Sequence, residues 1–245
     1  MPKRPIRFFN TTGPCNPDDH YMLPPADRLQ GAQLHRYVRD NLYWMLHAPR
    51  QTGKTTFLQS WAKELNASGN HVACYITIEM CQGIPEIERV MPTICGSICR
   101  HARLAGLPVP EIPTDTSANL LVAILEGWAA IVAPKPLIIL FDEVDVLEGE
   151  AMVSFLRQLR SGFATRSIGK FPTSIALVGL RDLKDYLVTA KDGKQVNPGS
   201  PFNIKADSAV IGNFSQDDVR HLFAQHTAET GQQITPDALD SVWEQ

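Results

Sequence analysis

The sequence predicts an α/β fold, a doubly wound parallel sheet. Short runs rich in strand-forming residues alternate with longer segments whose apolar residues recur at helical spacing. One run, residues 137–141, is apolar throughout, which is typical of a strand covered on both faces. The chain has 245 residues, of which 44% are hydrophobic, enough for a sizeable core. This composition excludes a disordered chain, a collagen-like fibre and a small disulfide scaffold.

The first third of the chain is expected to begin irregularly and then to alternate. Residues 1–25 contain Gly-Pro and Pro-Pro turn signals, and a helix is expected over 26–41. A buried strand is expected over 42–47, followed by a helix over about 55–65 with its apolar residues on one face. Residues 72–78 are rich in strand formers and predict the next strand.

The middle of the chain continues the alternation. Residues 85–104 and 116–132 have helical character, with a proline-rich loop between them. The apolar strand at 137–141 follows, then a helix near 150–163 and a strand over 174–178. Strands that alternate with helices in this way are typical of an open parallel sheet with helices on both faces.

The pattern after about residue 205 is expected to be helical. Ser215 suits the N-cap of one helix, and Thr235 followed by Pro236 suits the start of another. We therefore expect an α/β domain over 1–205 and the start of a helical lid domain over 206–245, which the end of the chain truncates.

Charge and cysteine content give limited information about partners. The 23 basic and 26 acidic side chains give a net charge of −3, which does not support binding to nucleic acid or to an anionic membrane. No apolar run reaches the roughly 18 residues of a membrane span. The five cysteines form no C-x-x-C pair and suit buried thiols of the reducing cytoplasm. The alternative is a metal contact by Cys95 and Cys99 with His101.

A loop between the strand at 42–47 and the following helix matches the pattern of a phosphate-binding loop, with alanine in place of the first glycine. Glycine at position 53 admits close approach of the backbone to a β-phosphate, and Lys54 supplies a charge to the β- and γ-phosphates. The hydroxyl of Thr55 suits a magnesium ligand. The predicted nucleotide-binding residues here are Ala48, Pro49, Arg50, Gln51, Thr52, Gly53, Lys54, Thr55 and Thr56.

Two acidic residues follow the apolar strand at 137–141. A carboxylate at the end of such a strand can lie beside the phosphate loop, so Asp142 is the second predicted magnesium ligand. Glu143 would then polarise a water toward the γ-phosphate. For Asp145 two interpretations stay open, assistance at the site or a role in the turn.

Arginines near the next strand have two interpretations each. Arg181 or Asp182, which follow the strand at 174–178, would sense the γ-phosphate; the alternative is a structural salt bridge at the strand end. Three further arginines suit either an arginine finger toward a neighbouring subunit or a solvated surface, namely Arg157, Arg160 and Arg166.

Together, the phosphate loop, the acidic strand end and the C-terminal helices resemble AAA+ and STAND-type P-loop ATPases. They are most similar to the bacterial and archaeal AAA-like group related to origin-recognition ATPases. Residues 8–14 (FFNTTGP) and 20–25 (HYMLPP) resemble the N-terminal leader of that group. The resemblance implies ATP and Mg²⁺ as cofactors and a leader beside the adenine, with His20, Tyr21 and Leu23 as candidate contacts. The chain departs from the family at Arg181, where many members have asparagine or threonine.

The predicted function is Mg-dependent ATP binding and hydrolysis that couples nucleotide state to movement of the lid or a partner. Glu143, Lys54 and Arg181 are the predicted catalytic residues. One alternative is a nucleotide-gated switch or scaffold with negligible turnover. Another is an origin-recognition-like DNA-binding protein, which the charge does not support. The expected partners are ATP or ADP and, through a region beyond Gln245, another protein or a second copy of the chain; no membrane is expected.

Overall fold

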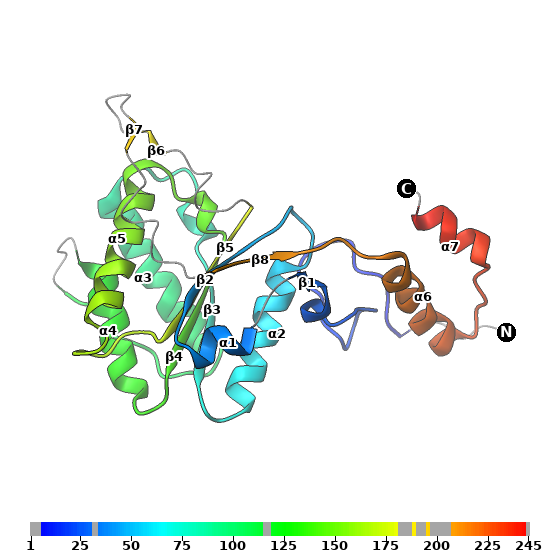
Figure 1. The fold of residues 1–245 in the computed structure, drawn as a ribbon, viewed down its shortest axis with the longest axis horizontal. Helices are drawn as coiled ribbons and strands as arrows, with labels where there is room; N and C mark the ends of the chain where they lie inside the picture. The colour runs from blue at the N-terminus through cyan, green and yellow to red at the C-terminus, as the bar shows by residue number, and fades with distance from the viewer. Residues whose placement is uncertain are drawn as a thin grey trace.

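The computed structural model describes residues 6–30, 34–114, 119–180, 188–189, 195–196 and 207–243. Its main sheet has six strands in the order β1-β8-β2-β5-β4-β3 (Figure 1). Five of them are parallel and β1 is antiparallel to β8, so the predicted fold class is confirmed. The strands are β1 (Leu29–Gln30), β2 (Tyr43–His47), β3 (Val72–Thr77), β4 (Leu137–Asp142), β5 (Ser174–Gly179) and β8 (Asp207–Ile211). A separate pair consists of β6 (Val188–Thr189) and β7 (Gln195–Val196).

Helices cover both faces of the sheet. On one face α1 (Leu34–Arg39) and α2 (Lys54–Ala67) pack on Trp44 and Leu46 of β2. On the other face α3 (Ile87–Leu104), α4 (Leu120–Val132) and α5 (Gly149–Thr165) pack on Met45 of the same strand. Successive side chains of a strand point to opposite faces, and both faces are covered here, so Tyr43 to Leu46 of β2 are all buried. This explains the continuous apolar runs.

Helix α2 follows the predicted pattern closely. Phe57 and Trp61 stack with their ring centroids 5.7 Å apart, and the ring of Trp44 meets that of Trp61 edge-on at 5.6 Å. The chain leaves the helix through Gly69, whose φ of 74° suits a residue without a side chain. The aromatic cluster of Trp44, Phe57 and Trp61 therefore packs α2 against β2.

The expected helix over 26–41 is wrong. The segment instead contains a 3₁₀ turn, η1 (Pro25–Arg28), the short strand β1, and α1, which has six residues. Leu29 pairs with Ile211 of β8 and Gln30 pairs with Val210, so these two residues complete the edge of the sheet. Pairing of β1 with the distant strand β8 has overridden the local helical pattern.

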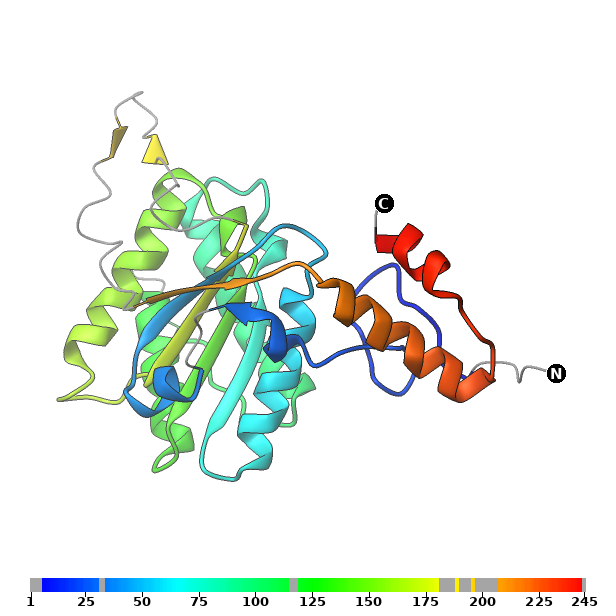
Figure 2. The same cartoon turned by 45° about the vertical axis from the view of Figure 1, so that its right-hand side comes forward.

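A wholly helical segment after residue 205 is also wrong. β8 lies within the main sheet between β1 and β2, with Ala209 and Ile211 buried. The helices α6 (Gln216–Thr230) and α7 (Pro236–Trp243) follow it and stand to one side of the sheet, beside the N-terminal segment (Figures 1 and 2). The predicted cap is confirmed, because the Ser215 hydroxyl accepts a hydrogen bond from the Asp218 N–H at 3.1 Å.

Four of the five cysteines are buried thiols. Cys74, Cys81, Cys95 and Cys99 are buried without disulfides, and burial raises the pKa of Cys95 to about 12. In the part of the chain that the structure describes, no group of three or more His, Cys, Asp or Glu side chains could hold a metal ion. The metal contact considered for Cys95 and Cys99 therefore has no supporting cluster. Among the described helices, none has the length and apolar character needed to cross a membrane.

Candidate functional site

A cavity of about 1150 Å³ opens where the carboxyl ends of β3 and β4 meet the loop after β2. Parallel strands bring these ends to one edge of the sheet, where ligands of open α/β folds bind. Residues from the N-terminal leader and from the segment around Phe214 close its other side. The predicted site residues that line the cavity are Arg50, Gln51, Thr52, Gly53, Lys54, Thr55, Thr56, Tyr21, Leu23, Asp142 and Glu143.

Three predicted site residues do not line the cavity. Ala48 and Pro49 instead supply backbone carbonyls to the loop's lysine. His20 faces the leader itself, since its Nδ1 accepts a hydrogen bond from the Asn16 N–H at 2.9 Å and its ring meets that of Phe8 edge-on. Arg181 lies outside the described residues.

The loop between β2 and α2 has the backbone of a tight phosphate-type turn. Gln51 and Gly53 have φ values of 60° and 92°, which curl the chain before the helix begins. Lys54 Nζ donates to the carbonyls of Ala48 and Pro49, each at 2.7 Å. Burial lowers the pKa of Lys54, and nearby carboxylates led by Asp142 oppose that change. The two carbonyls thus hold the Lys54 amino group over the loop.

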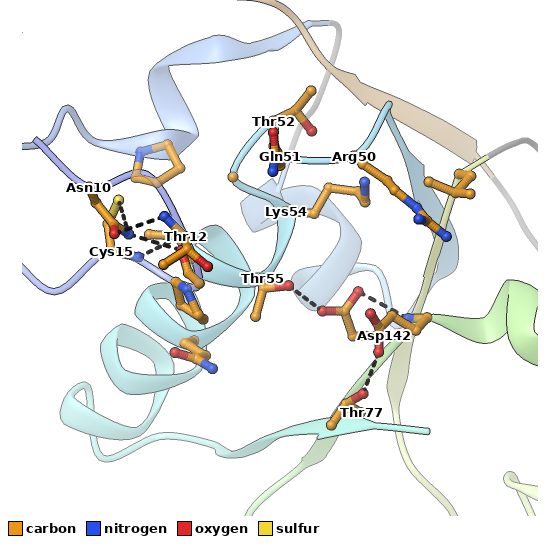
Figure 3. Close-up of a pocket in the computed structure, with 18 of the residues that line it drawn as sticks. Asn10, Thr12, Cys15, Arg50, Gln51, Thr52, Lys54, Thr55, Thr77 and Asp142 are labelled. Atoms are coloured by element: carbon orange, nitrogen blue, oxygen red, sulfur yellow. Dashed lines mark hydrogen bonds between the residues drawn. The ribbon is translucent and has the colours of Figure 1, made fainter. Parts of the chain in front are cut away.

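Asp142 brings the acidic strand end into direct contact with the loop. The Thr55 hydroxyl donates to Asp142 Oδ2 at 2.7 Å, and Figure 3 shows the two side chains pointing toward each other. The Glu143 N–H donates to Oδ1 at 3.0 Å, and the Tyr75 hydroxyl lies 3.4 Å from Oδ2. Burial raises the pKa of Asp142, while these hydrogen bonds and Lys54 lower it. A buried carboxylate and a hydroxyl therefore share one corner of the cavity.

Glu143 sits in a strained conformation beside Asp142. Its φ of 60° and ψ of 39° place a residue with a side chain in the left-handed region, at a cost of about 1–2 kcal/mol. The Thr77 hydroxyl, at the end of β3, donates to Glu143 Oε2 at 2.8 Å (Figure 3). Burial raises the pKa of Glu143, the Thr77 bond lowers it, and Asp142 raises it further. The strain and the hydrogen bond together aim this carboxylate along the cavity.

Sequence reasoning missed several residues of the cavity. Thr77 was detectable in principle, because it is the last residue but one of the predicted strand at 72–78; it pairs in register with Asp142. For the others only the tertiary structure brings the segments together. The missed residues include Cys15, Arg28, Gln59, Tyr75 and Phe214. Phe9, Asn10, Thr11 and Thr12 also line the cavity; they lie in the leader segment that the family resemblance placed beside the base, but were not named as contacts.

The leader joins α2 to α6. The Cys15 N–H donates to the Thr56 hydroxyl at 3.0 Å, beside Asn10 and Thr12 in Figure 3. At its other side, Phe9 packs on Phe223 of α6, with centroids 4.8 Å apart. Three further contacts tie the leader to α6: the ion pair between Arg7 and Glu229, the bond from Gln225 to the Met22 carbonyl, and the Tyr21–His226 contact.

The chain is similar in structure to origin-recognition proteins. Cdc6p from Pyrobaculum aerophilum matches with a TM-score of 0.54 at 17% identity, over 84% of this chain and 50% of that chain. The Aeropyrum pernix ORC2 protein, in ADPNP–ADP complexes, matches with 0.51 at 12% identity, over 80% and 50%. Drosophila ORC bound to poly(dA/dT) DNA and Cdc6 matches with 0.50 at 10% identity, over 80% and 30%.

Sequence comparisons add no closer assignment. No family model matches the chain, and no curated protein matches it. The chain spans about half the length of the two archaeal proteins. At these identities the similarity shows the fold alone, which this chain shares with the Cdc6p and ORC2 proteins.

Proposed function

We propose that this chain binds ATP with Mg²⁺ in the cavity and hydrolyses it to ADP and phosphate. The observation that carries the proposal is the 2.7 Å hydrogen bond from Thr55 to Asp142, next to Lys54. It joins the two motifs that lie far apart in the sequence, one suited to phosphate and the other to metal. Among the structures with this fold, the ORC2 protein is described in complexes with ADPNP and ADP, which supports a nucleotide as the ligand here.

The phosphate loop would hold the triphosphate through its main chain and one cation. The N-terminus of α2, a helix of 14 residues, directs its partial positive charge into the cavity. Lys54 Nζ now donates to two neutral carbonyls, and it would exchange them for charged β- and γ-phosphate oxygens, which are stronger acceptors.

Thr55 and Asp142 fit magnesium. Mg²⁺ prefers hard oxygen ligands, uses few of them from the protein and completes its shell with water and phosphate. One hydroxyl and one carboxylate that already touch meet that requirement, and burial that raises the pKa of Asp142 favours a cation beside it. When bound, the ion would neutralise charge on the phosphates.

Glu143 is proposed as the residue that orients and deprotonates the attacking water. The water oxygen would attack the γ-phosphorus, the bond to the β–γ bridging oxygen would break, and the proton would pass to the carboxylate. Thr77 holds Glu143 Oε2 and leaves Oε1 for that water. Arg181, outside the described residues, is proposed as a γ-phosphate sensor because it follows β5, the strand between β2 and β4.

The leader is proposed to cover the base, and α6 with α7 to begin the lid. Tyr21 and Leu23 line the cavity on the leader side, and the contacts of the leader with α6 connect the two. In this proposal nucleotide exchange moves the lid, or a partner bound to it, relative to the sheet.

A phosphate-release assay tests the proposal. Wild type should release phosphate from Mg-ATP. Glu143→Gln should bind ATP but release phosphate at least about a hundredfold more slowly, as expected for loss of a general base. Lys54→Ala should bind ATP poorly. Equal background release by wild type and Glu143→Gln, with ATP still bound, would replace the ATPase by a nucleotide-gated switch. A wild type that binds no nucleotide would overturn both.

A further inference from the structure

Arg28 lies where three segments of the chain meet. It ends η1, and its carbonyl accepts a hydrogen bond from the Gly212 N–H at 3.0 Å. Its Nη2 donates to the carbonyl of Thr52 in the phosphate loop at 2.8 Å, and its Nη1 donates to the carbonyl of Gly212 at 3.2 Å. The ring of Phe214 covers the guanidinium, with Cζ 4.1 Å from the ring centroid. One side chain therefore links the leader, the loop and the segment between β8 and α6.

The bond to Thr52 orients a peptide group of the loop. In a planar trans peptide, the carbonyl of Thr52 and the N–H of Gly53 point in opposite directions. Because Arg28 binds the carbonyl, the Gly53 N–H is directed away from the guanidinium. A Cβ on Gly53 would lie 2.9 Å from Nη2, so glycine here makes room for the arginine as well as for φ of 92°.

Because the guanidinium of Arg28 is rigid, movement of the Thr52 carbonyl affects the group bonded to the Gly212 carbonyl. Its nitrogens form a planar fork, so the donors to Thr52 and Gly212 cannot move independently. The segment that contains Gly212 continues into the capping box of Ser215 and Asp218, which starts α6. The Nε of Arg28 is buried and, among the described residues, has no hydrogen-bond partner. The two carbonyl bonds and the Phe214 contact hold the side chain there in spite of that cost.

We propose that Arg28 is a positioning residue that couples phosphate binding in the loop to the order of residues 212–218. The inference rests on the proposed function. A phosphate bound to the loop fixes the orientation of the Thr52–Gly53 peptide. The fixed Thr52 carbonyl holds the guanidinium of Arg28, and the guanidinium in turn orders residues 212–218, which lead into α6. Arg28 acts through the loop backbone and through Gly212.

Hydrogen exchange of the full chain with and without Mg-ADP tests the coupling. In wild type, saturating Mg-ADP should slow exchange in the loop at 48–55 and also at 212–218, there about tenfold, within the usual range for coupled sites. Arg28→Gln, measured at an ADP concentration that saturates it, should keep the loop response and lose most of the response at 212–218. Arg28→Lys keeps the charge but has no fork, so it should lose that response too. Arg103, an exposed arginine of α3, provides the matched control: Arg103→Gln should respond like wild type.

The outcomes separate the inference from the function on which it rests. No loop response in wild type overturns the proposed function and the inference with it. The inference alone is overturned if the loop responds and the ratio of exchange rates at 212–218 without and with Mg-ADP is the same in Arg28→Gln as in wild type. This holds even if exchange at 212–218 is faster in the variant under both conditions, because that result describes a purely structural arginine. If Arg28→Gln does not fold, Arg28→Lys decides by the same ratio.

Discussion

The hydrogen bond between Thr77 and Glu143 allows a pH test of the proposed chemistry. Thr77→Val replaces the hydroxyl by a methyl group of similar shape on a strand, where valine is favoured. The variant therefore removes the 2.8 Å bond to Glu143 Oε2 and leaves the strand in place. Burial already raises the pKa of Glu143, and the bond from Thr77 opposes that rise because it stabilises the carboxylate. Loss of the bond should therefore make the pKa of Glu143 higher in the variant than in wild type.

The size of the effect follows from the kind of bond. A hydrogen bond to a charged group contributes about 1.5 kcal/mol, and 1.36 kcal/mol corresponds to one pKa unit. Glu143 is half-buried, so solvent replaces part of the loss and we expect a rise of about 0.5–1 unit. A general base works only when deprotonated, so the acidic limb of the rate profile should move to higher pH by the same amount.

The assay is steady-state phosphate release at saturating Mg-ATP from pH 5 to pH 9, for wild type and Thr77→Val. Thr93→Val on α3 is the matched control, because its hydroxyl donates to the Arg89 carbonyl on the exposed face of that helix. Its profile should coincide with that of wild type. An acidic limb that stays in place in Thr77→Val, or that moves to lower pH, would refute Glu143 as the titrating base.

Two further predictions concern ligand binding and stability. Mg-ATP at about a thousand times its Kd should stabilise the fold by roughly 4 kcal/mol, measured as a shift in Tm; Lys54→Ala should remove most of this shift and Lys63→Ala, exposed on the same helix, should keep it. Asp142→Asn should abolish the Mg²⁺ dependence of ATP binding but raise the Tm of the free protein at neutral pH. Burial raises the pKa of Asp142, so its ionised form opposes folding above that pKa and the penalty disappears as the pH falls below the unfolded value. This reasoning would be contradicted if Asp142→Asn without ligand melted at a lower temperature than wild type at pH 7 and at the same temperature as wild type at pH 4.

The parts of the fold that follow from local pattern were predictable from the sequence. The runs that became β2 and β4 are apolar up to their last residues, His47 and Asp142, because both faces of a central parallel strand are covered. The helical spacing of Phe57 and Trp61 specified the buried face of α2. The loop between β2 and α2 was recognisable because phosphate binding restricts residue types over a few adjacent positions.

Other parts depended on pairing between distant segments. β1 and β8 are five residues or shorter, and each becomes a strand through pairing across the length of the chain, so neither the predicted helix at 26–41 nor the helical pattern after 205 contained that information. The same holds for Phe214 in the cavity wall, whereas the place of the leader beside the cavity was expected from the family resemblance.

By itself, the sequence determined the parallel α/β core, the loop at 48–55 and the acidic strand end, since each depends on hydrophobic burial or on residues adjacent in the chain. Only the tertiary structure decided that Thr55 touches Asp142, that Thr77 holds Glu143 and that Arg28 bridges the loop to Gly212. The contacts of Asp142 and Thr77 depend on strand order and register, because a change of one residue in register would turn the side chains of a strand to the opposite face of the sheet.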